Sequence, residues 1–296
     1  MANQSTYQKE IERLSKLGEA YVKPPGSATY YQRITTSATG MRAFNNWIKS
    51  NMILTYCKNK ESVLDIGCGR GGDLIKFIHA HIGEYVGVDI DNNGLYVIND
   101  SAFNRYKNLK NTNKNVPPMY FINADARGLF NVKSQESIIP NMSNANKKLI
   151  ETYLSGNKKY SIINCQFTLH YYLSDDLSWS NFCKNINNHL EDNGYVLITC
   201  FDGKLIYDKL LGKQKMTVSY TDNRGIKNVF FEINKVYNDN DIDDNKLGMA
   251  IDLYNSLISN PGTYLREYLV FPDFLKESLK KRSRTAFSPA LAARPG

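Results

Sequence analysis

The feature that most constrains the fold is a cluster of glycines between a short apolar run and a helical pattern. The segment from Val63 to Phe77 reads V-L-D-I-G-C-G-R-G-G-D-L-I-K-F. Four glycines fall within six positions, and Leu74, Phe77 and Ile78 then recur at helical spacing. This order predicts a strand, a tight turn and a helix, the unit with which α/β proteins bind adenosine-containing ligands.

The acidic residues beside the turn favour one class of ligand. Gly67, Gly69 and Gly72 also match the G-x-G-x-x-G pattern of dinucleotide sites, so a nucleotide-dependent oxidoreductase stays open as an alternative. Asp65 would face the ligand from the strand end, where a carboxylate repels a pyrophosphate but suits the ammonium and sulfonium of S-adenosylmethionine. Asp89 ends the next apolar run, 22 positions beyond Gly67, where an acid can accept both ribose hydroxyls.

Apolar runs alternate with amphipathic segments over residues 60–201, which predicts strands alternating with helices. We therefore expect an α/β fold with a doubly wound, mostly parallel sheet of the Rossmann-like, class I S-adenosylmethionine-dependent methyltransferase type. The region 128–159 is predicted to be a long surface loop with one helix near 147–154. The other strands are expected over 84–90, 119–124, 160–171 and 195–201, the other helices over 39–54, 95–106, 179–190 and 205–211, and a hairpin over 217–236.

The composition indicates which kinds of binding partner and which cellular location to expect. A net charge of +8 with twenty tyrosines fits a polyanion that offers bases for stacking, but also a surface that is merely rich in lysine. No run of 18 apolar residues and no signal-peptide pattern occurs, so we expect an intracellular protein without a membrane partner. The five cysteines and four histidines show no metal-ligand spacing, and we expect no metal.

Polar side chains gather at three places in the predicted fold. Asn45 and Lys49 lie four residues apart on an otherwise apolar helix with Asn46 beside them, although a solvated helix face has the same pattern. Asp125 follows the third strand, where it either accepts a hydrogen bond from adenine or serves an ordinary turn. The fourth strand ends in side chains that can stack on and hydrogen-bond a base, namely Gln166, Phe167, His170 and Tyr171.

Four motifs then occur in a fixed order: F-N-N-W-I-K-S, L-D-I-G-C-G-R-G-G-D-L-I-K-F, C-Q-F-T-L-H-Y and E-Y-L-V-F. Together they resemble the messenger-RNA cap guanine-N(7) methyltransferase family over about residues 30–275. The forms D-I-G-C-G and F-D-G-K are most similar to the methyltransferase domains of capping enzymes from large cytoplasmic DNA viruses. The resemblance implies transfer of a methyl group from S-adenosylmethionine to nitrogen-7 of the terminal guanosine of capped RNA, in the host cytoplasm or the virion.

The resemblance also implies roles for individual residues. Lys49 would hold the carboxylate of S-adenosylmethionine, Gly67 would lie against its methionine part, and Asp89 under its ribose. The remaining donor contacts would come from Asp125, Gln166 and Tyr171. The cap would be lined by Asn45, Asn46, Arg70, Lys76, Arg105, Phe167, His170 and Glu267, of which Glu267, His170 and Phe167 would lie nearest the reacting base.

We expect an N-terminal arm over residues 1–29, a methyltransferase domain over 30–282 with a hairpin and helix insertion around 204–262, and an atypical tail over 283–296. The tail lacks the aromatic closing strand of the family, which favours as an alternative a non-catalytic RNA-binding or scaffold subunit on the same fold. No K-x-D-G motif of a guanylyltransferase is present. Triphosphatase and guanylyltransferase domains of the same polypeptide, or a stimulatory subunit, are the expected protein partners.

Overall fold

The computed structural model describes residues 36–155, 157–239, 246–256 and 262–282. The expected arm over 1–29, the expected tail over 283–296 and most of the acidic run near 240–245 lie outside the described residues. The domain boundaries therefore stay predictions. Within the described ranges, no helix combines the length and the hydropathy that a membrane span requires.

The centre of the protein is a five-stranded sheet in the order β3-β2-β1-β4-β5, with every neighbouring pair parallel. This confirms the predicted doubly wound sheet. The strand order reverses between β1 and β4, and in such sheets ligands bind at the carboxyl ends of the strands beside the reversal. The strands are β1 (Ser62–Ile66), β2 (Glu84–Asp89), β3 (Met119–Asn123), β4 (Tyr160–Gln166) and β5 (Leu190–Thr199).

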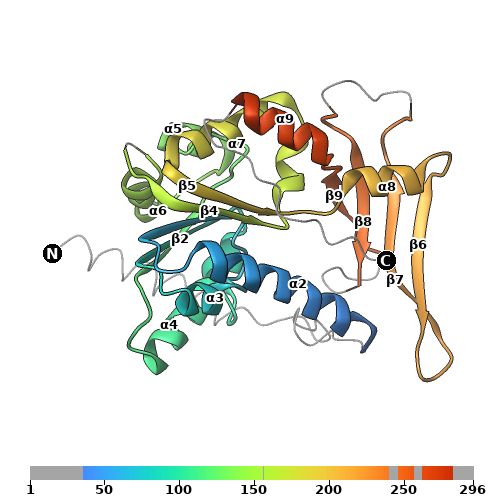
Figure 1. The fold of residues 1–296 in the computed structure, drawn as a ribbon, viewed down its shortest axis with the longest axis horizontal. Coiled ribbons are helices and arrows are strands. Elements are labelled where there is room, and N and C mark those ends of the chain that lie inside the picture. Colours follow the sequence, from blue (N-terminus) through green and yellow to red (C-terminus); the bar gives the residue numbers. More distant parts are fainter. Residues whose placement is uncertain (1–35, 156, 240–245, 257–261, 283–296) are drawn as a thin grey trace.

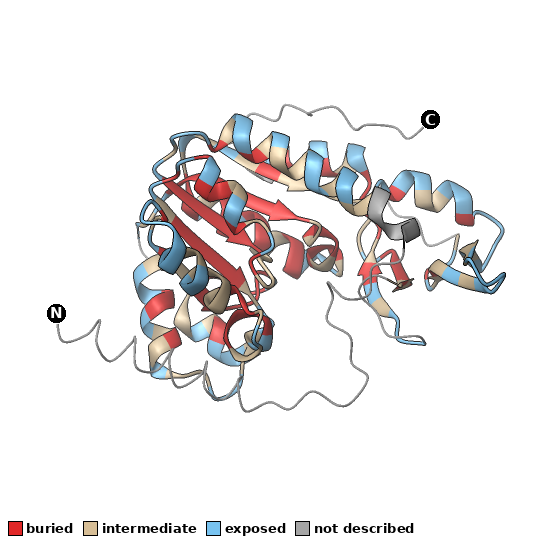
Figure 2. Ribbon diagram, turned by 90° about the horizontal axis from the view of Figure 1, so that it is seen from below, coloured by how far each residue is buried: buried red, intermediate tan, exposed pale blue. Residues whose placement is uncertain are grey.

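Helices cover both faces of this sheet (Figure 1). Alternate strand residues enter the two cores: Val63 packs on the side of α2 and α3, whereas Leu64 and Ile66 pack on the side of α7 and α9. The strands β1 to β4 are mostly buried between these layers, as Figure 2 shows, whereas most residues of the edge strand β5 are partly or fully exposed. One face carries α2 (Thr36–Tyr56), α3 (Leu74–His79), η1 (Asn93–Val97) and α4 (Ala102–Thr112); the other carries α5 (Val132–Ile138), α6 (Asn144–Leu149), η2 (Ile150–Leu154), α7 (Asp176–His189) and α9 (Pro272–Arg282).

A second, antiparallel sheet stands beside the first (Figure 1). It follows α8 (Gly203–Leu210) and has the order β6-β7-β8-β9. The predicted hairpin over 217–236 corresponds to β6 and β7, but the sheet continues beyond 262 into β9 and has its own apolar core against α8. The strands are β6 (Lys215–Thr221), β7 (Lys227–Lys235), β8 (Ala250–Asn255) and β9 (Leu265–Tyr268).

Two predicted segments differ in ways that affect the site. The region 128–159 is not a surface loop, because α5 precedes α6 and the fully buried amide of Gln135 bonds the backbone N (2.8 Å) and O (2.9 Å) of Asp125. The predicted helix over 95–106 is broken, since Ser101 caps a new helix by accepting a hydrogen bond from Asn104 N (3.3 Å). Arg105 consequently lies in the first turn of α4 and not near a helix end.

The strand bounds also shift around the reversal of the sheet. The predicted strand over 160–171 ends at Gln166 and continues as a short 3-10 helix, η3 (Leu169–Leu173). β5 starts at Leu190 rather than Tyr195, with an irregular register between Tyr160 and Ile162 of its neighbour β4. Residues 167–171 therefore leave the sheet and turn toward the second sheet.

Candidate active site

The glycine turn after β1 needs its glycines for two different reasons. Gly67 has a φ of +77°, and a Cβ there would lie 2.5 Å from both the methyl carbon and the hydroxyl oxygen of Thr168. Gly69 and Gly71 have φ values of +53° and +68°, whereas Gly72 has no positive φ, so the third glycine of the G-x-G-x-x-G pattern is not the strained one. A Cβ on Gly69 would meet no described atom within 4 Å. The turn thus leaves open space above Gly69.

Replacing Gly67 by alanine tests this geometry. We expect Gly67→Ala to lower the free energy of unfolding by about 3 kcal/mol, because positive-φ strain adds to a side-chain clash. Gly212→Ala is a matched control, since Gly212 has a φ of +68° but open space around its Cβ position. It should cost only about 1 kcal/mol. Urea unfolding followed by circular dichroism measures both, and equal losses would contradict the close packing at Gly67.

The carboxylate of Asp89 is fixed by the backbone at the end of β2. Its Oδ2 accepts a hydrogen bond from Gly69 N (2.7 Å), and its Oδ1 accepts one from Asp91 N (2.8 Å). Burial raises the pKa of Asp89 above its ordinary value, and these backbone donors oppose the shift. Each oxygen keeps a lone pair, so the residue can still accept two ribose hydroxyls.

The sequence predicts that Asp65 faces the ligand from the end of β1. In the structure its carboxylate is buried instead. Asp65 is 4% exposed, and its two oxygens accept hydrogen bonds from Tyr85 Oη (2.6 Å) and Asn164 Nδ2 (2.7 Å). Burial raises the pKa of Asp65 to about 6. Gln166 joins the same set of bonds, donating to Asn164 Oδ1 and accepting from Thr199 Oγ1, both at 2.7 Å. The carboxylate therefore lies beneath the turn, inside a polar network.

Lys49 and Lys76 meet at a residue that the sequence analysis did not single out. Asp73, at the start of α3, binds Lys49 Nζ through Oδ2 (2.9 Å) and Lys76 Nζ through Oδ1 (2.7 Å). Lys76 Nζ also donates to Asn46 Oδ1 (3.3 Å), while Asn45 is half-buried on α2. Helices α2 and α3 thus bring three of the predicted contacts to one edge of the turn.

Arg70 and Arg105 meet in the same way at Asp100. Arg70 Nη1 lies 3.3 Å and 3.4 Å from the two carboxylate oxygens, and Arg105 Nη2 lies 3.6 Å from Oδ2. Arg105 Nε also donates to the backbone oxygen of Asp100 (2.9 Å). Two guanidinium groups that lie side by side are suited to binding phosphate.

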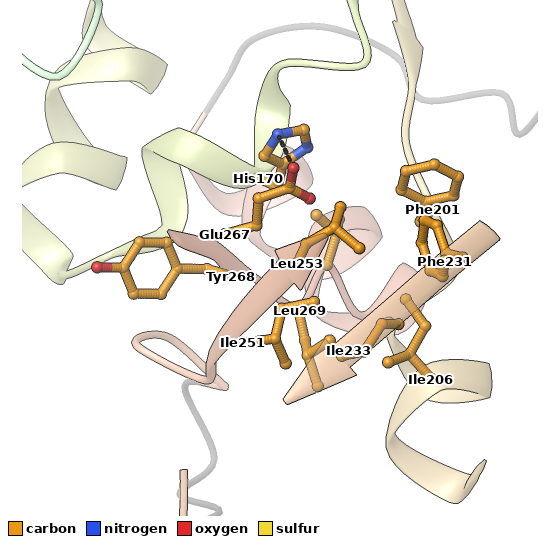
Figure 3. Close-up of a pocket in the computed structure, with 12 residues that line it drawn as sticks. His170, Phe201, Ile206, Phe231, Ile233, Ile251, Leu253, Glu267, Tyr268 and Leu269 are labelled. Carbon is orange, nitrogen blue, oxygen red and sulfur yellow. Dashed lines mark ion pairs between the residues drawn. The ribbon is translucent and has the colours of Figure 1, made fainter. Parts of the chain in front are cut away.

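His170 and Glu267 face each other in a small pocket between η3 and the second sheet (Figure 3). His170 Nε2 lies 3.6 Å from Glu267 Oε1 and makes no hydrogen bond to any described residue. Burial raises the pKa of Glu267 to about 7 and lowers that of His170 to about 4. A neutral imidazole thus faces a carboxyl that exchanges its proton near pH 7. The other lining residues are mostly apolar and include Phe201, Ile206, Phe231, Ile233 and Leu253.

Tyr171 packs beside His170 and interacts electrostatically with an acid in each predicted site. Its ring centre is 4.2 Å from that of His170. Burial raises the pKa of Tyr171 to about 12, and the charges of Glu267 and Asp89 add to the shift. The charges of both carboxylates therefore act on its hydroxyl. The residue links the predicted donor and acceptor sites.

Phe167 adopts a backbone conformation that bulky residues rarely take. Its φ is +56°, and its N donates to Thr199 O (2.9 Å). The ring lies 5.8 Å from Phe201, centre to centre. Strain of this kind concentrates at binding and catalytic sites, where the surrounding structure holds it in place.

Asp125 serves its own turn in this structure. Its Oδ1 accepts from Arg127 N (2.9 Å), its Oδ2 lies 2.6 Å from Arg127 Nη2, and its backbone oxygen accepts from Gly128 N (3.0 Å). Its charge also reaches Asp89, whose pKa it helps to raise. In the structure, Asp125 therefore makes the contacts of an ordinary turn residue. A hydrogen bond from adenine to Asp125 stays a prediction.

Sequence reasoning missed five residues that organise the site: Asp73, Asp100, Asn164, Phe201 and Phe231. Signals existed for Asp73, which lies inside the glycine motif at the start of the helix, and for Asn164, which lies two residues before Gln166 on the same face of its strand. Asp100, Phe201 and Phe231 become neighbours of the predicted residues only when distant elements pack together.

The parallel sheet, the glycine turn at its reversal, the acid in β1 and the acid at the end of β2 define a class I S-adenosylmethionine-dependent methyltransferase, of which S-adenosylmethionine is the cofactor. The residues fit that donor, since Lys49 can meet its carboxylate and Asp65 lacks a cationic partner of its own among the described residues. No cluster of metal-ligating side chains occurs within the described ranges. The chain belongs to the mRNA (guanine-N(7))-methyltransferase domain family, whose model matches residues 5–281.

Two proteins that are similar to this chain have names that concern the mRNA cap. The chain is 68% identical over 282 residues to a "Probable mRNA-capping enzyme" of Acanthamoeba polyphaga mimivirus, covering 95% of this chain but only 24% of the viral protein. It is 24% identical over 271 residues to mRNA cap guanine-N(7) methyltransferase 1 of Arabidopsis thaliana, covering 84% of this chain and 68% of that protein. A crystal structure of an S-adenosylmethionine-dependent methyltransferase from Clostridium acetobutylicum shares 16% identity at a TM-score of 0.44, covering 93% of this chain and 86% of that one.

Proposed function

We propose that this chain transfers the methyl group of S-adenosylmethionine to nitrogen-7 of the terminal guanosine of capped mRNA. The observation that carries the proposal is the buried Glu267–His170 pair, in a partly aromatic pocket that Tyr171 connects to the donor turn. Membership of the cap methyltransferase family and the names of the relatives support the acceptor.

The donor supplies an electrophilic methyl group on a cationic sulfur. In the proposal, Lys49 leaves Asp73 in part to hold the donor carboxylate, Asp89 accepts the ribose hydroxyls, and Gln166 and Asp125 contact the adenine side. These residues orient the donor and do not exchange a proton with it. Gly67 lies against the methionine part through its backbone, because Thr168 occupies the position where its Cβ would stand.

The acceptor side requires neither a nucleophile nor a general base. Nitrogen-7 of guanine has a free lone pair, and its methylation releases no proton. Holding the two substrates in line can therefore supply much of the acceleration, about 7–11 kcal/mol in favourable intramolecular models. Glu267 binds the guanine edge and stabilises the positive charge that develops on the base. Phe167 and His170 confine the ring, while Arg70, Lys76 and Arg105 take the triphosphate bridge and Asn45 and Asn46 line the same side.

The chain spans about a quarter of the mimivirus protein's length. We propose that it works beside triphosphatase and guanylyltransferase domains of one capping polypeptide, in the host cytoplasm or the virion. A stimulatory subunit is the alternative partner.

The test is methyl transfer from labelled S-adenosylmethionine to RNA that ends in a guanosine cap, with the same RNA ending in a 5′-triphosphate as control. We expect label on the capped RNA alone, and nuclease digestion should release it as N7-methylguanosine. Donor binding without label on capped RNA would favour the scaffold alternative. Tighter binding of NAD than of S-adenosylhomocysteine would favour an oxidoreductase.

A further inference from the structure

A chain of hydrogen-bonded side chains crosses four strands beneath the donor turn. Tyr85 on β2 and Asn164 on β4 donate to the two oxygens of Asp65 on β1, at 2.6 Å and 2.7 Å. Gln166 Nε2 donates to Asn164 Oδ1 and Thr199 Oγ1 on β5 donates to Gln166 Oε1, both at 2.7 Å. Asn164 is completely buried and stands at the middle of this chain.

The negative charge on Asp65 determines which group donates and which accepts in each hydrogen bond of this network. An ionised carboxylate only accepts hydrogen bonds, so Asn164 must turn its NH₂ group toward Asp65 and its oxygen toward Gln166. Gln166 must then offer its own NH₂ group to Asn164, which leaves its oxygen for Thr199. One buried amide thus orients a carboxylate and a second amide, both beside the predicted donor.

Asp65 is a buried charge without a cation of its own among the described residues. Its two partners are neutral, and the ammonium of Lys49 lies 2.9 Å from Asp73 instead. Burial of a carboxylate with neutral donors alone is costly, and a positive group bound above the turn would offset that cost. The donor that fits this turn carries an ammonium beside its carboxylate.

We propose that Asn164 is a positioning residue for the donor: it holds Asp65 as the counter-charge of the donor ammonium and fixes the orientation of Gln166. This rests on the proposed function, since it assumes that S-adenosylmethionine binds at the turn. Asn164 itself touches neither substrate in this proposal.

The effect of Asp65 on donor binding can be followed by varying the pH, because the thiols around it and Tyr85 do not lose their protons over the range used. Burial raises the pKa of Cys57 and Cys165 to about 12, and raises those of Cys68 and Tyr85 well above their ordinary values. These four groups therefore stay protonated between pH 6 and pH 9. The ionisable residues near enough to interact electrostatically with Asp65 are Lys49, Cys57, Cys68, Asp73, Tyr85 and Cys165.

The first test is Asn164→Ala, with Ser278→Ala as the matched control. Ser278 is also buried and makes one side-chain hydrogen bond, from Trp179 Nε1 (2.6 Å), in the core on the other face of the sheet. Calorimetry should show a dissociation constant for S-adenosylmethionine at least tenfold higher for Asn164→Ala, with the KM for capped RNA within twofold of the parent. Ser278→Ala should change neither constant. Unchanged donor affinity, or an equal loss for both substrates, would overturn the proposal.

The second test is Asn164→Asp, which keeps the shape of the side chain. Two neighbouring buried carboxyls share one proton, so the new carboxyl can donate to Asp65 and accept from Gln166 as the amide does. The ratio of variant to parent dissociation constants for S-adenosylmethionine should be near one at pH 6.5 and should depart from one once the pH is high enough to remove the shared proton. A ratio that does not change with pH contradicts the proposal. A parent protein that binds no S-adenosylmethionine contradicts the proposed function instead.

Discussion

Glu267→Ala is expected to lower kcat for methyl transfer to capped RNA by about a hundredfold or more, while the dissociation constant of S-adenosylmethionine changes less than twofold. Glu267 is 5% exposed and lies in β9, beside His170 and across the pocket from Phe201 and Phe231 (Figure 3). Removing one electrostatic contact to developing charge in a buried site costs a factor of about 10²–10³ in other enzymes. Donor binding should persist because the predicted donor residues lie in the first sheet, its turns and the helices beside it, and none of them lies in β9.

The pH dependence of the methyl-transfer rate distinguishes the effect of the charge on Glu267 from the effect of its side-chain shape. Burial raises the pKa of Glu267 to about 7, and only its anion stabilises a positive guanine. The rate at saturating donor should therefore rise from pH 6 to pH 8 and level off above. His170 stays neutral over that interval, since burial lowers its pKa to about 4. Glu267→Gln keeps the shape, so it should be slow at every pH and should lack this rise.

Glu232→Gln is the matched control for Glu267→Gln. Glu232 lies on β7 in the same sheet, but beside Ile233, which lines the pocket, so its side chain points to the opposite face. There it accepts hydrogen bonds from Tyr264 Oη (2.6 Å) and Thr217 Oγ1 (2.9 Å). Normal turnover is expected for this variant. A Glu267→Ala protein that loses donor affinity and turnover to the same extent would remove the assigned role.

The sequence was sufficient where the signal is local. The glycine turn, the strands on either side of it and the acid after β2 were predictable, because alternating apolar runs and glycines act within a few residues. The ends of helices carried signals too: Ser101 and Asn131 cap α4 and α5 through their side chains. The broken helix was nevertheless missed because its apolar spacing continues across the break.

Long-range packing explains what could not be predicted. Asp73 reaches Lys49 across 24 residues and Asp100 reaches Arg70 across 30, and no spacing rule connects such pairs. The helix α5 has a polar sequence because most of its residues are partly or fully exposed and the buried Gln135 bonds backbone groups of the turn at Asp125. Its polar composition therefore resembled a surface loop, although the segment is helical.

Asp89→Ala is expected to weaken S-adenosylmethionine binding by about a hundredfold or more. Two ribose hydroxyls lose a charged acceptor, and each hydrogen bond to a charged group contributes about 1.5–3 kcal/mol. Gly69 N and Asp91 N also lose the oxygens that fix the turn. The melting temperature should fall as well, but kcat at saturating donor should fall far less than the affinity, because Asp89 does not contact the acceptor.

Asp91→Ala is the control for this change, because Asp91 is exposed and its side chain accepts a hydrogen bond from Asn93 N (3.1 Å). Calorimetry with S-adenosylmethionine should show parental affinity for Asp91→Ala. Asp89→Asn should fall between the two alanine variants, since an amide oxygen can replace only one of the two carboxylate oxygens that Gly69 N and Asp91 N now bind. If Asp89→Asn bound the donor as the parent does, the ribose would not depend on the carboxylate. The affinity would then have to come from the buried charge of Asp65 and from Lys49, at the other end of the turn.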